Sequence, residues 1–308
     1  MSDFFSGGWS IFIAVVTIAG LLACLLLLLI AARRKVMAGD NTTGHVWDED
    51  LRELNNPLPR WWMWLFILTV VFGAGYITLY PGLGSAPGAL HWSSRGQYEA
   101  EQAAARQAAA PIYASFQGLG AAELAADPKA MAIGERLFAQ TCSGCHGADA
   151  RGSKGFPNLA DRDWLGGDGS VAYIEKTIRE GRQGVMPPMA AAVGSNEDVR
   201  HLAHYVLSLS GSPHDPIAAA QGRTKFAACA ACHGADGHGN TAIGAPNLTD
   251  DTWLHGWGED AIVAMVNSGR TNTMPPQASR LTPEQVHVLA TYVWSLSHSS
   301  NVVHSAQN

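Results

Sequence analysis

Residues 142–146 read Cys-Ser-Gly-Cys-His, and residues 229–233 read Cys-Ala-Ala-Cys-His. Cys-x-x-Cys-His is the attachment signature of c-type haem, in which both thiols form thioethers with one porphyrin and the adjoining imidazole coordinates its iron. The spacing is chemical, because two sulfurs and one ring must reach the same porphyrin from a single tight turn. The pattern therefore predicts two covalently bound haem c groups, held by Cys142, Cys145 and His146 and by Cys229, Cys232 and His233.

Each haem motif is followed by a Met-Pro-Pro sequence at nearly the same distance. Met186 lies 40 residues after His146, and Met274 lies 41 residues after His233. A thioether sulfur suits haem iron, and His/Met ligation raises the reduction potential of a cytochrome c. A single methionine is more often a filler of core gaps. The matched pair favours Met186 as the distal ligand of the first iron and Met274 as that of the second. Met189 is a rival for the first iron, but the second repeat has no methionine at the matching position.

Cysteine usage and composition narrow the other possibilities. Structural zinc normally takes four Cys or His ligands, and neither motif offers two more at finger spacing. The fifth cysteine, Cys24, lies in an apolar run and leaves no pair for a disulfide. The other histidines are expected to be surface or packing residues, because each iron already has two candidate ligands. With a formal net charge of −6 and no basic stretch, the chain is not expected to bind nucleic acid.

Two uncharged apolar runs, residues 11–32 and 61–80, are each long enough to cross a bilayer. We expect the first to be retained rather than cleaved as a signal peptide, because residues 1–10 carry no Lys or Arg and Arg-Arg-Lys follows at residues 33–35. The loop 33–60 holds the basic residues of this region, so the positive-inside rule places it in the cytoplasm. Two transmembrane helices in a bacterial inner membrane are predicted, with everything after residue 80 periplasmic.

The loop and the linker carry weaker signals. Acidic and leucine residues in the loop 33–60 predict a short amphipathic turn at the headgroups, ended by two prolines. Residues 81–126 are expected to form a periplasmic linker. Its alanine-rich part, residues 97–110, predicts a helix that stops at Pro111.

Two repeats of about 87 residues follow the linker. Asp127 and Asp215 each precede a proline and are expected to cap a helix, and each repeat closes with a helix that starts at a capping box. Gly134 and Gly222 occupy equivalent helix positions, where glycine costs about 1 kcal/mol relative to alanine, so they predict close helix crossings. The expected fold is all-α: two transmembrane helices, then tandem cytochrome c-type domains at residues 127–211 and 212–300, and a tail at residues 301–308.

Nearly the whole chain resembles the di-haem subunit, CcoP or FixP, of cbb3-type cytochrome c oxidase. The most specific part is His-x-Trp-Asp at residues 45–48, Glu-Leu-Asn-Asn-Pro-Leu-Pro-Arg-Trp-Trp at 53–62 and Tyr-Pro-Gly-Leu-Gly at 80–84. The resemblance implies electron delivery from soluble or membrane-bound periplasmic cytochromes c. Electrons would pass through a mono-haem cytochrome c subunit to the catalytic haem-copper subunit, which reduces oxygen to water. No catalytic residue is expected in this chain itself.

Three other functions share some of these features. The cytochrome subunit of a periplasmic dehydrogenase would have the haem repeats but would lack the loop at residues 45–62. A di-haem peroxidase needs an iron with an open or switchable sixth position, which the two Met-Pro-Pro sequences argue against. A haem-based gas sensor would carry a signalling output domain, and the sequence shows no sign of one.

Overall fold

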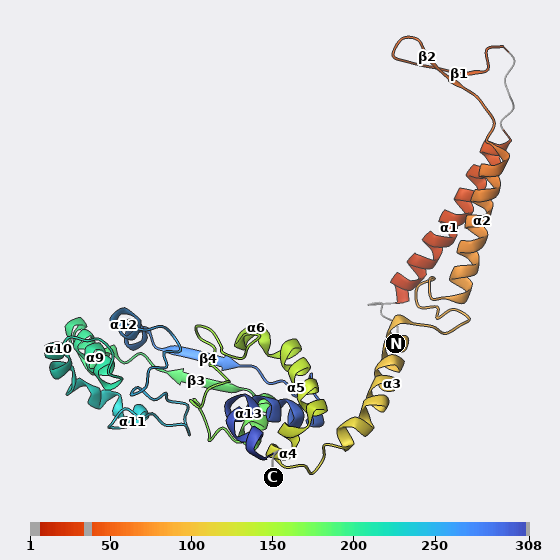
Figure 1. Ribbon diagram of the computed structural model, residues 1–308. Coiled ribbons are helices and arrows are strands. Elements are labelled where there is room, and N and C mark those ends of the chain that lie inside the picture. Colours follow the sequence, from red (N-terminus) through yellow and green to blue (C-terminus); the bar gives the residue numbers. More distant parts are fainter. Residues whose placement is uncertain (1–6, 34–38, 306–308) are drawn as a thin grey trace. The chain divides into compact units, whose positions relative to one another are not determined.

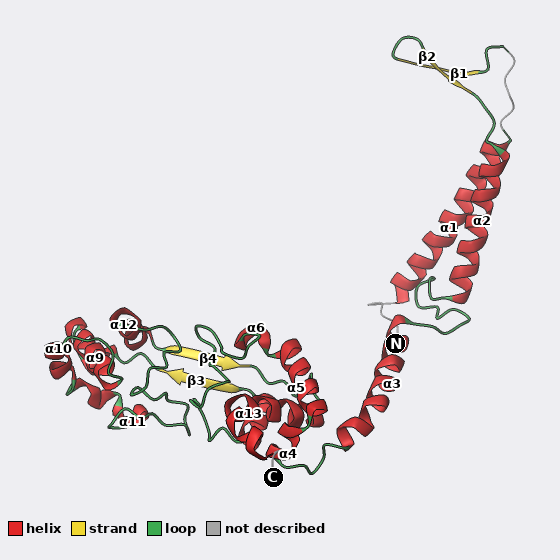
Figure 2. Cartoon of the chain, viewed as in Figure 1, coloured by secondary structure: helices red, strands yellow, loops and turns green. Residues whose placement is uncertain are grey.

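The computed structural model describes residues 7–33 and 39–305, with side chains described as far as residue 298. The chain forms two compact units that divide between Ala109 and Ala110. The first unit holds two long apolar helices and a small hairpin, and the second holds both Cys-x-x-Cys-His motifs (Figure 1). The fold is mostly helical, as the sequence predicts (Figure 2). The described residues also include two two-stranded sheets that the sequence did not indicate.

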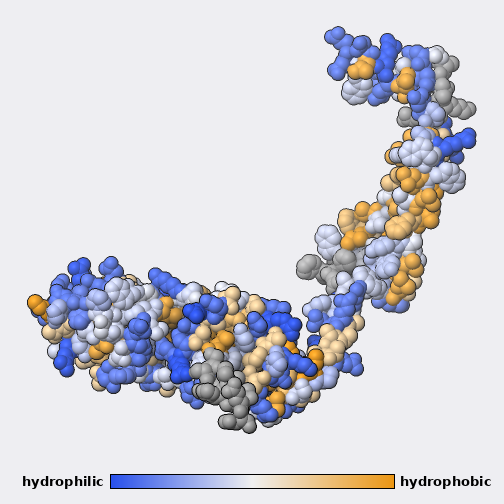
Figure 3. Space-filling view, in the orientation of Figure 1, coloured by the Kyte–Doolittle hydropathy of each residue, from blue (hydrophilic) through white to orange (hydrophobic). Residues whose placement is uncertain are grey.

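Helices α1 (Gly7–Ala32) and α2 (Arg60–Leu79) lie side by side in the first unit. Both are long and apolar enough to cross a membrane. Leu28 is the one buried residue in α1, and α2 has none, so the apolar side chains of both helices face outward (Figure 3). Exposed apolar surface of this extent is unfavourable in water. The pair therefore does not form a self-contained soluble core.

The loop between these helices forms a β-hairpin rather than the predicted amphipathic turn. Strand β1 (Thr42–Trp47) pairs antiparallel with β2 (Leu51–Leu54). Asp48 and Glu49 at the tip have φ of 44° and 71°, the left-handed conformation that tight hairpin turns require. The Trp47 indole N–H donates to a Glu53 carboxylate oxygen at 3.1 Å, a contact that ties the strands together. The turn was missed because its left-handed residues are not glycine or asparagine.

Helix α3 (Ser94–Ala114) runs past its predicted end. Pro111 lies inside its last turn, and the helix continues to Ala114. Proline lacks a backbone N–H and disrupts a helix mainly through the bond to the residue four positions earlier. The helix loses this one backbone hydrogen bond and still continues to Ala114.

The second unit contains both repeats. The side chain of Asp127 accepts a hydrogen bond from the backbone N–H of Lys129 at 2.7 Å, and Asp215 accepts one from Ile217 at 2.8 Å, which confirms both predicted caps. Both predicted capping boxes are also formed. The elements are α4 (Ala121–Ala126), α5 (Pro128–Thr141), α6 (Ser143–His146), α7 (Val171–Glu180), β3 (Arg182–Met186), α8 (Ala190–Val193), α9 (Asn196–Leu209), α10 (Pro216–Gly222), the 3-10 helix η1 (Lys225–Ala228), α11 (Ala230–His233), α12 (Glu259–Ser268), β4 (Arg270–Met274) and α13 (Pro283–Ser305).

The C-terminal helices of the two repeats are exchanged. Helix α13 of the second repeat packs on α5 and α7 of the first, while α9 of the first repeat packs on α10 and α12 of the second. A Cβ added to Gly134 in α5 would lie 2.5 Å from Cβ of Tyr292 in α13. A Cβ added to Gly222 in α10 would meet the backbone of His201 in α9. The close crossings predicted at both glycines are present, and each one joins the two repeats.

Each hydrophobic core consequently mixes side chains from both repeats. One core contains Phe138 of α5 with Leu289 of α13, and the other contains Leu202 of α9 with Phe226 of η1. We call the body built on α5, α7 and α13 the first half, and the body built on α9, α10 and α12 the second half. The sequence places one folded domain in each repeat; the packing instead assembles each half from parts of both.

Candidate haem sites

The first Cys-x-x-Cys-His motif forms one helical turn directly after α5. Cys142 ends α5, and α6 ends at His146, whose ring is buried with 8% of its surface exposed. The His146 Nδ1 lies 3.0 Å from the carbonyl oxygen of Pro157. A carbonyl oxygen only accepts, so Nδ1 carries the proton and Nε2 keeps its lone pair. The ring is thus fixed in the tautomer that a metal ligand requires.

The second motif has the same local geometry. Cys229 precedes α11, which ends at His233, and this ring is also 8% exposed. Its Nδ1 lies 3.0 Å from the carbonyl oxygen of Pro246. The two motifs therefore present equivalent imidazoles, each held by the proline of its own Pro-Asn-Leu sequence.

The cysteines divide into a half-buried and an exposed member in each motif. Cys142 and Cys229 are half-buried, and Cys145 and Cys232 are exposed. Burial raises the pKa of the Cys142 thiol to about 11, with a smaller effect from Cys145, and burial also raises the pKa of Cys229. Zinc binds the thiolate form. Within residues 7–33 and 39–305, no group of three His, Cys, Asp or Glu side chains is placed to hold a metal ion.

The two Met-Pro-Pro sequences lie at the ends of an antiparallel ribbon that connects the halves. Strands β3 and β4 pair so that Arg182 faces Met274 and Met186 faces Arg270 (Figure 1). Met274 packs against the core of the first half, and Cys142 borders the same core. Met186 packs against the core of the second half, and Cys229 borders the same core. The ribbon thus carries each methionine to the motif of the other repeat.

Backbone contacts fix this crossed arrangement. The N–H of Gln277, just after one Met-Pro-Pro, donates to the carbonyl of Ile178 in α7 at 2.9 Å. The N–H of Met189, at the matching place in the first repeat, donates to the carbonyl of Val266 in α12 at 2.8 Å. Met189 itself packs on the core of the second half, beside Met186. Order along the chain pairs Met186 with His146, whereas in the structure Met186 packs against the same core as Cys229, the first cysteine of the other motif.

A glycine before each Met-Pro-Pro sequence lies in close contact with the methionine loop of the other repeat. Gly181 has φ of 71°, and a Cβ there would collide with the carbonyl of Met274. Gly269 has φ of 62°, and a Cβ there would collide with the carbonyl of Met186. Glycine is needed at both positions because the backbone is left-handed and touches the methionine loop of the other repeat.

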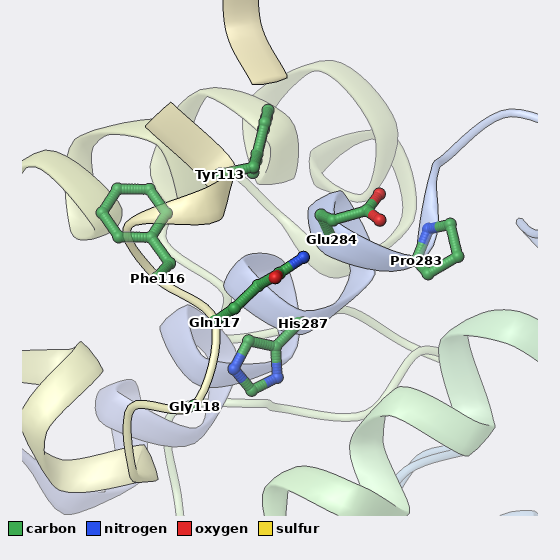
Figure 4. A pocket seen from close by; sticks show the side chains of 7 residues that line it. All are labelled: Tyr113, Phe116, Gln117, Gly118, Pro283, Glu284 and His287. Atoms are coloured by element: carbon green, nitrogen blue, oxygen red, sulfur yellow. The ribbon is translucent and has the colours of Figure 1, made fainter. Parts of the chain in front are cut away.

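A separate cavity of about 320 Å³ lies between the residues after α3 and the start of α13 (Figure 4). His287 lines it, and its Nδ1 lies 2.6 Å from a carboxylate oxygen of Glu175 in α7. None of the residues around this cavity belongs to a haem motif or to a Met-Pro-Pro sequence. The cavity is therefore distinct from the two candidate haem sites.

Comparison with known proteins shows the family to which the chain belongs. Residues 39–87 match the family model described as the N-terminal domain of cytochrome oxidase-cbb3, FixP, and residues 129–206 and 218–293 match cytochrome c oxidase, cbb3-type, subunit III. A cbb3-type cytochrome c oxidase subunit CcoP of Rubrivivax gelatinosus is 61% identical over 302 residues, which cover 98% of this chain and 99% of the relative. The chain belongs to the CcoP/FixP family of cbb3-type oxidase subunits.

Other CcoP/FixP relatives are more distant. A FixP subunit of Azorhizobium caulinodans is 39% identical over 276 residues, covering 84% of this chain and 93% of the relative. A CcoP subunit of Cereibacter sphaeroides is 37% identical over 274 residues, covering 83% and 94%. The CcoP/FixP family and its cytochrome domains identify the chain as a cytochrome c electron-transfer subunit of an oxidoreductase complex, and these domains imply haem c. The N-terminal apolar helix is consistent with membrane anchoring.

Two side chains near the sites were not singled out from the sequence. Arg182 and Arg270 occupy the same place when the two repeats of the chain are aligned. Arg182 is half-buried, however, and Arg270 is exposed. His255 was grouped with the packing histidines, and its Nε2 lies 2.9 Å from the Asn272 side-chain nitrogen. The available signal was a mismatch between the repeats, because His255 and Asn272 both stand where the first repeat has glycine.

Proposed function

We propose that this CcoP/FixP-type chain is a membrane-anchored di-haem cytochrome c. It takes electrons from periplasmic cytochromes c and delivers them, through a mono-haem cytochrome c subunit, to the haem-copper subunit that reduces oxygen. The observation that carries the proposal is the pair of equivalent buried imidazoles, His146 and His233, in motifs whose first cysteine packs against the same core as a Met-Pro-Pro methionine. Two such sites in one chain suit transfer of single electrons between partners.

The residues of both sites fit a c-type haem. Each imidazole is buried and bonded at Nδ1, which leaves Nε2 for an iron. The paired thiols have no other role in the described residues, and the half-buried member of each pair borders an apolar core. A haem bound there supplies an iron that gains and loses one electron. The protein would hold the histidine and the methionine in place and exclude water, so that little would reorganise when the charge changes.

The packing supports the proposal that His146 and Met274 would hold one iron and that His233 and Met186 would hold the other. This assignment replaces the pairing by order along the chain. The ribbon of β3 and β4 brings Met274 to the core that borders Cys142 and brings Met186 to the core that borders Cys229. His/Met ligation raises the potential of a cytochrome c, and a methionine at each iron would leave no position for oxygen or peroxide.

We further propose that α1 and α2 both span the inner membrane, with the hairpin of β1 and β2 in the cytoplasm and the haem halves in the periplasm. The length and apolar surface of the two helices support the spans. The basic residues near their connected ends support the orientation. Trp61, Trp62 and Trp64 at the start of α2 suit the membrane interface.

The test uses chains that retain one haem motif. In a Cys229→Ala/Cys232→Ala chain, one haem remains at the first motif, and carbon monoxide binding reports whether its iron has lost a ligand. Adding Met274→Ala should make that haem bind carbon monoxide, whereas adding Met186→Ala or Met189→Ala should not. The opposite result would restore the pairing by chain order. If no methionine substitution changes carbon monoxide binding, the proposal of a six-coordinate electron carrier fails.

A further inference from the structure

The guanidinium of Arg182 lies at the seam between the two repeats. It contacts Gly166 so closely that a Cβ at that glycine would overlap it, and its Cζ lies 4.9 Å from the centre of the Tyr173 ring. On its other side, Nη2 would lie 3.7 Å from a Cβ at Gly244, in the second repeat. The loops that flank it are joined by a hydrogen bond from the N–H of Gly167 to the carbonyl of Thr241, 3.1 Å long.

This cation lacks an anionic partner in the described residues. Burial lowers the pKa of Arg182, and no carboxylate acts on it within the part of the chain that the structure describes. A half-buried charge is costly unless it is paired, and stacking on Tyr173 compensates only part of that cost. The position therefore suits an anion that is not part of the polypeptide.

The location specifies which anion fits. Arg182 starts β3 opposite Met274, and Tyr173 belongs to α7, whose next residue, Ile174, lies in the core that borders Cys142. These contacts place Arg182 at the rim of the first candidate haem site. Haem carries two propionate carboxylates at one edge, and the planar guanidinium pairs with a carboxylate through two parallel hydrogen bonds.

The second repeat does not reproduce this arrangement. Aligning Trp253 with Trp164 places His255 where the first repeat has Gly166, so a side chain fills the space that Arg182 occupies in the first half. His255 contacts Asn272 at 2.9 Å, and Arg270 is exposed. Burial lowers the pKa of His255, and Arg270 and Lys154 add smaller effects, so the neutral imidazole is favoured.

We propose that Arg182 binds a propionate of the haem at the first motif, and that His255 excludes Arg270 from the equivalent position in the second half. The inference rests on the proposed function, because it requires a haem at each motif. One haem site then has a half-buried cation beside it and the other has a neutral imidazole. A nearby positive charge favours the reduced iron, so Arg182 raises the potential of one haem selectively.

The test is a redox titration of the full-length chain in detergent, followed at the haem c absorption band. Arg182→Gln should lower one of the two midpoint potentials, and the matched control Arg270→Gln should leave both unchanged. Arg182→Lys keeps the charge and should hold the potential closer to that of the parent. His255→Gly opens the second position to Arg270 and should raise the other potential.

Three results would each overturn the inference about Arg182 and His255. Unchanged potentials in Arg182→Gln, or an equal shift in Arg270→Gln, would overturn the inference. If Arg182→Gln does not fold, an unchanged second potential in His255→Gly overturns it instead. Haem content, measured as the pyridine haemochrome, separates this outcome from failure of the proposed function. A parent chain with two haems whose potentials do not respond to these substitutions contradicts the inference alone, whereas a parent chain with fewer than two haems contradicts the proposed function and the inference with it.

Discussion

The crossing of α5 and α13 predicts a measurable effect of one methyl group. In Gly134→Ala, the new Cβ would lie 2.5 Å from Cβ and 3.1 Å from Cγ of Tyr292, and 3.3 Å from the carbonyl oxygen of Val288. Carbon atoms pack best at about 3.5–4.0 Å, so the two helices must separate by about 1 Å. Such overpacking costs about 1–3 kcal/mol, and the better helix propensity of alanine offsets about 1 kcal/mol.

The expected net loss is about 1 kcal/mol of unfolding free energy, which corresponds to roughly 2–4 °C in Tm for a unit of this size. Gly144→Ala is the matched control, because nothing lies within 4 Å of a Cβ there and the second motif has Ala231 at the same place. We expect Gly144→Ala to be neutral or slightly stabilising. Thermal and denaturant unfolding, followed by circular dichroism, compares the two variants.

A second substitution shows which helix crosses α5. The atom that collides is the Cβ of Tyr292, so Tyr292→Gly should abolish the cost of Gly134→Ala, while Tyr205→Gly should leave that cost in place. Tyr205 is the counterpart of Tyr292 in α9, and it would be the partner if each repeat folded on itself. Loss of the cost in the Tyr205→Gly background would refute the helix exchange.

Three more predictions concern the rest of the chain. Hydrogen bonds from Lys225 and Ser195 hold the pKa of Asp198 well below its ordinary value, so the stability that Asp198 contributes is present above that ordinary pKa of about 4 and is lost as pH falls through the folded pKa. In Asp198→Asn, the free energy of unfolding should therefore fall less steeply with decreasing pH, below about pH 4, than in the parent chain. The same pH dependence in both chains would contradict this. Replacing residues 42–54 by a Gly/Ser linker should keep both haems but weaken co-purification with the catalytic subunit, and normal co-purification would exclude a docking role for the hairpin. Protease added to intact spheroplasts should cut the haem halves, and cleavage only after the membrane is breached would reverse the proposed orientation.

Local features of the second unit were predictable from the sequence, because each depends on neighbouring residues. The helix caps at Asp127 and Asp215 follow from an Asp-Pro pair, and the tight turns of the motifs follow from their spacing. The close approach at Gly134 was also predictable, since glycine inside a helix needs a reason. Each of these inferences depends only on residues that lie within one helical turn of each other along the sequence.

The identity of the packing partner was not predictable in the same way. The two repeats are so alike that Tyr205 and Tyr292 fit Gly134 equally well by sequence. The choice depends on the ribbon of β3 and β4, whose five-residue strands carry glycine, asparagine and threonine rather than a clear alternating pattern. Pairing each methionine with the nearer motif along the chain followed from the repeat, whereas the ribbon supports the crossed pairing that we propose.

The helix exchange also sets an order of completion during synthesis. The second half ends at α12, so every element it needs has been made before β4 and α13 emerge. The first half has its motif early but lacks Met274 and α13 until the end of translation. A nascent chain therefore finishes its later haem site first, and a ribosome that stops before residue 270 leaves the earlier site open on one side.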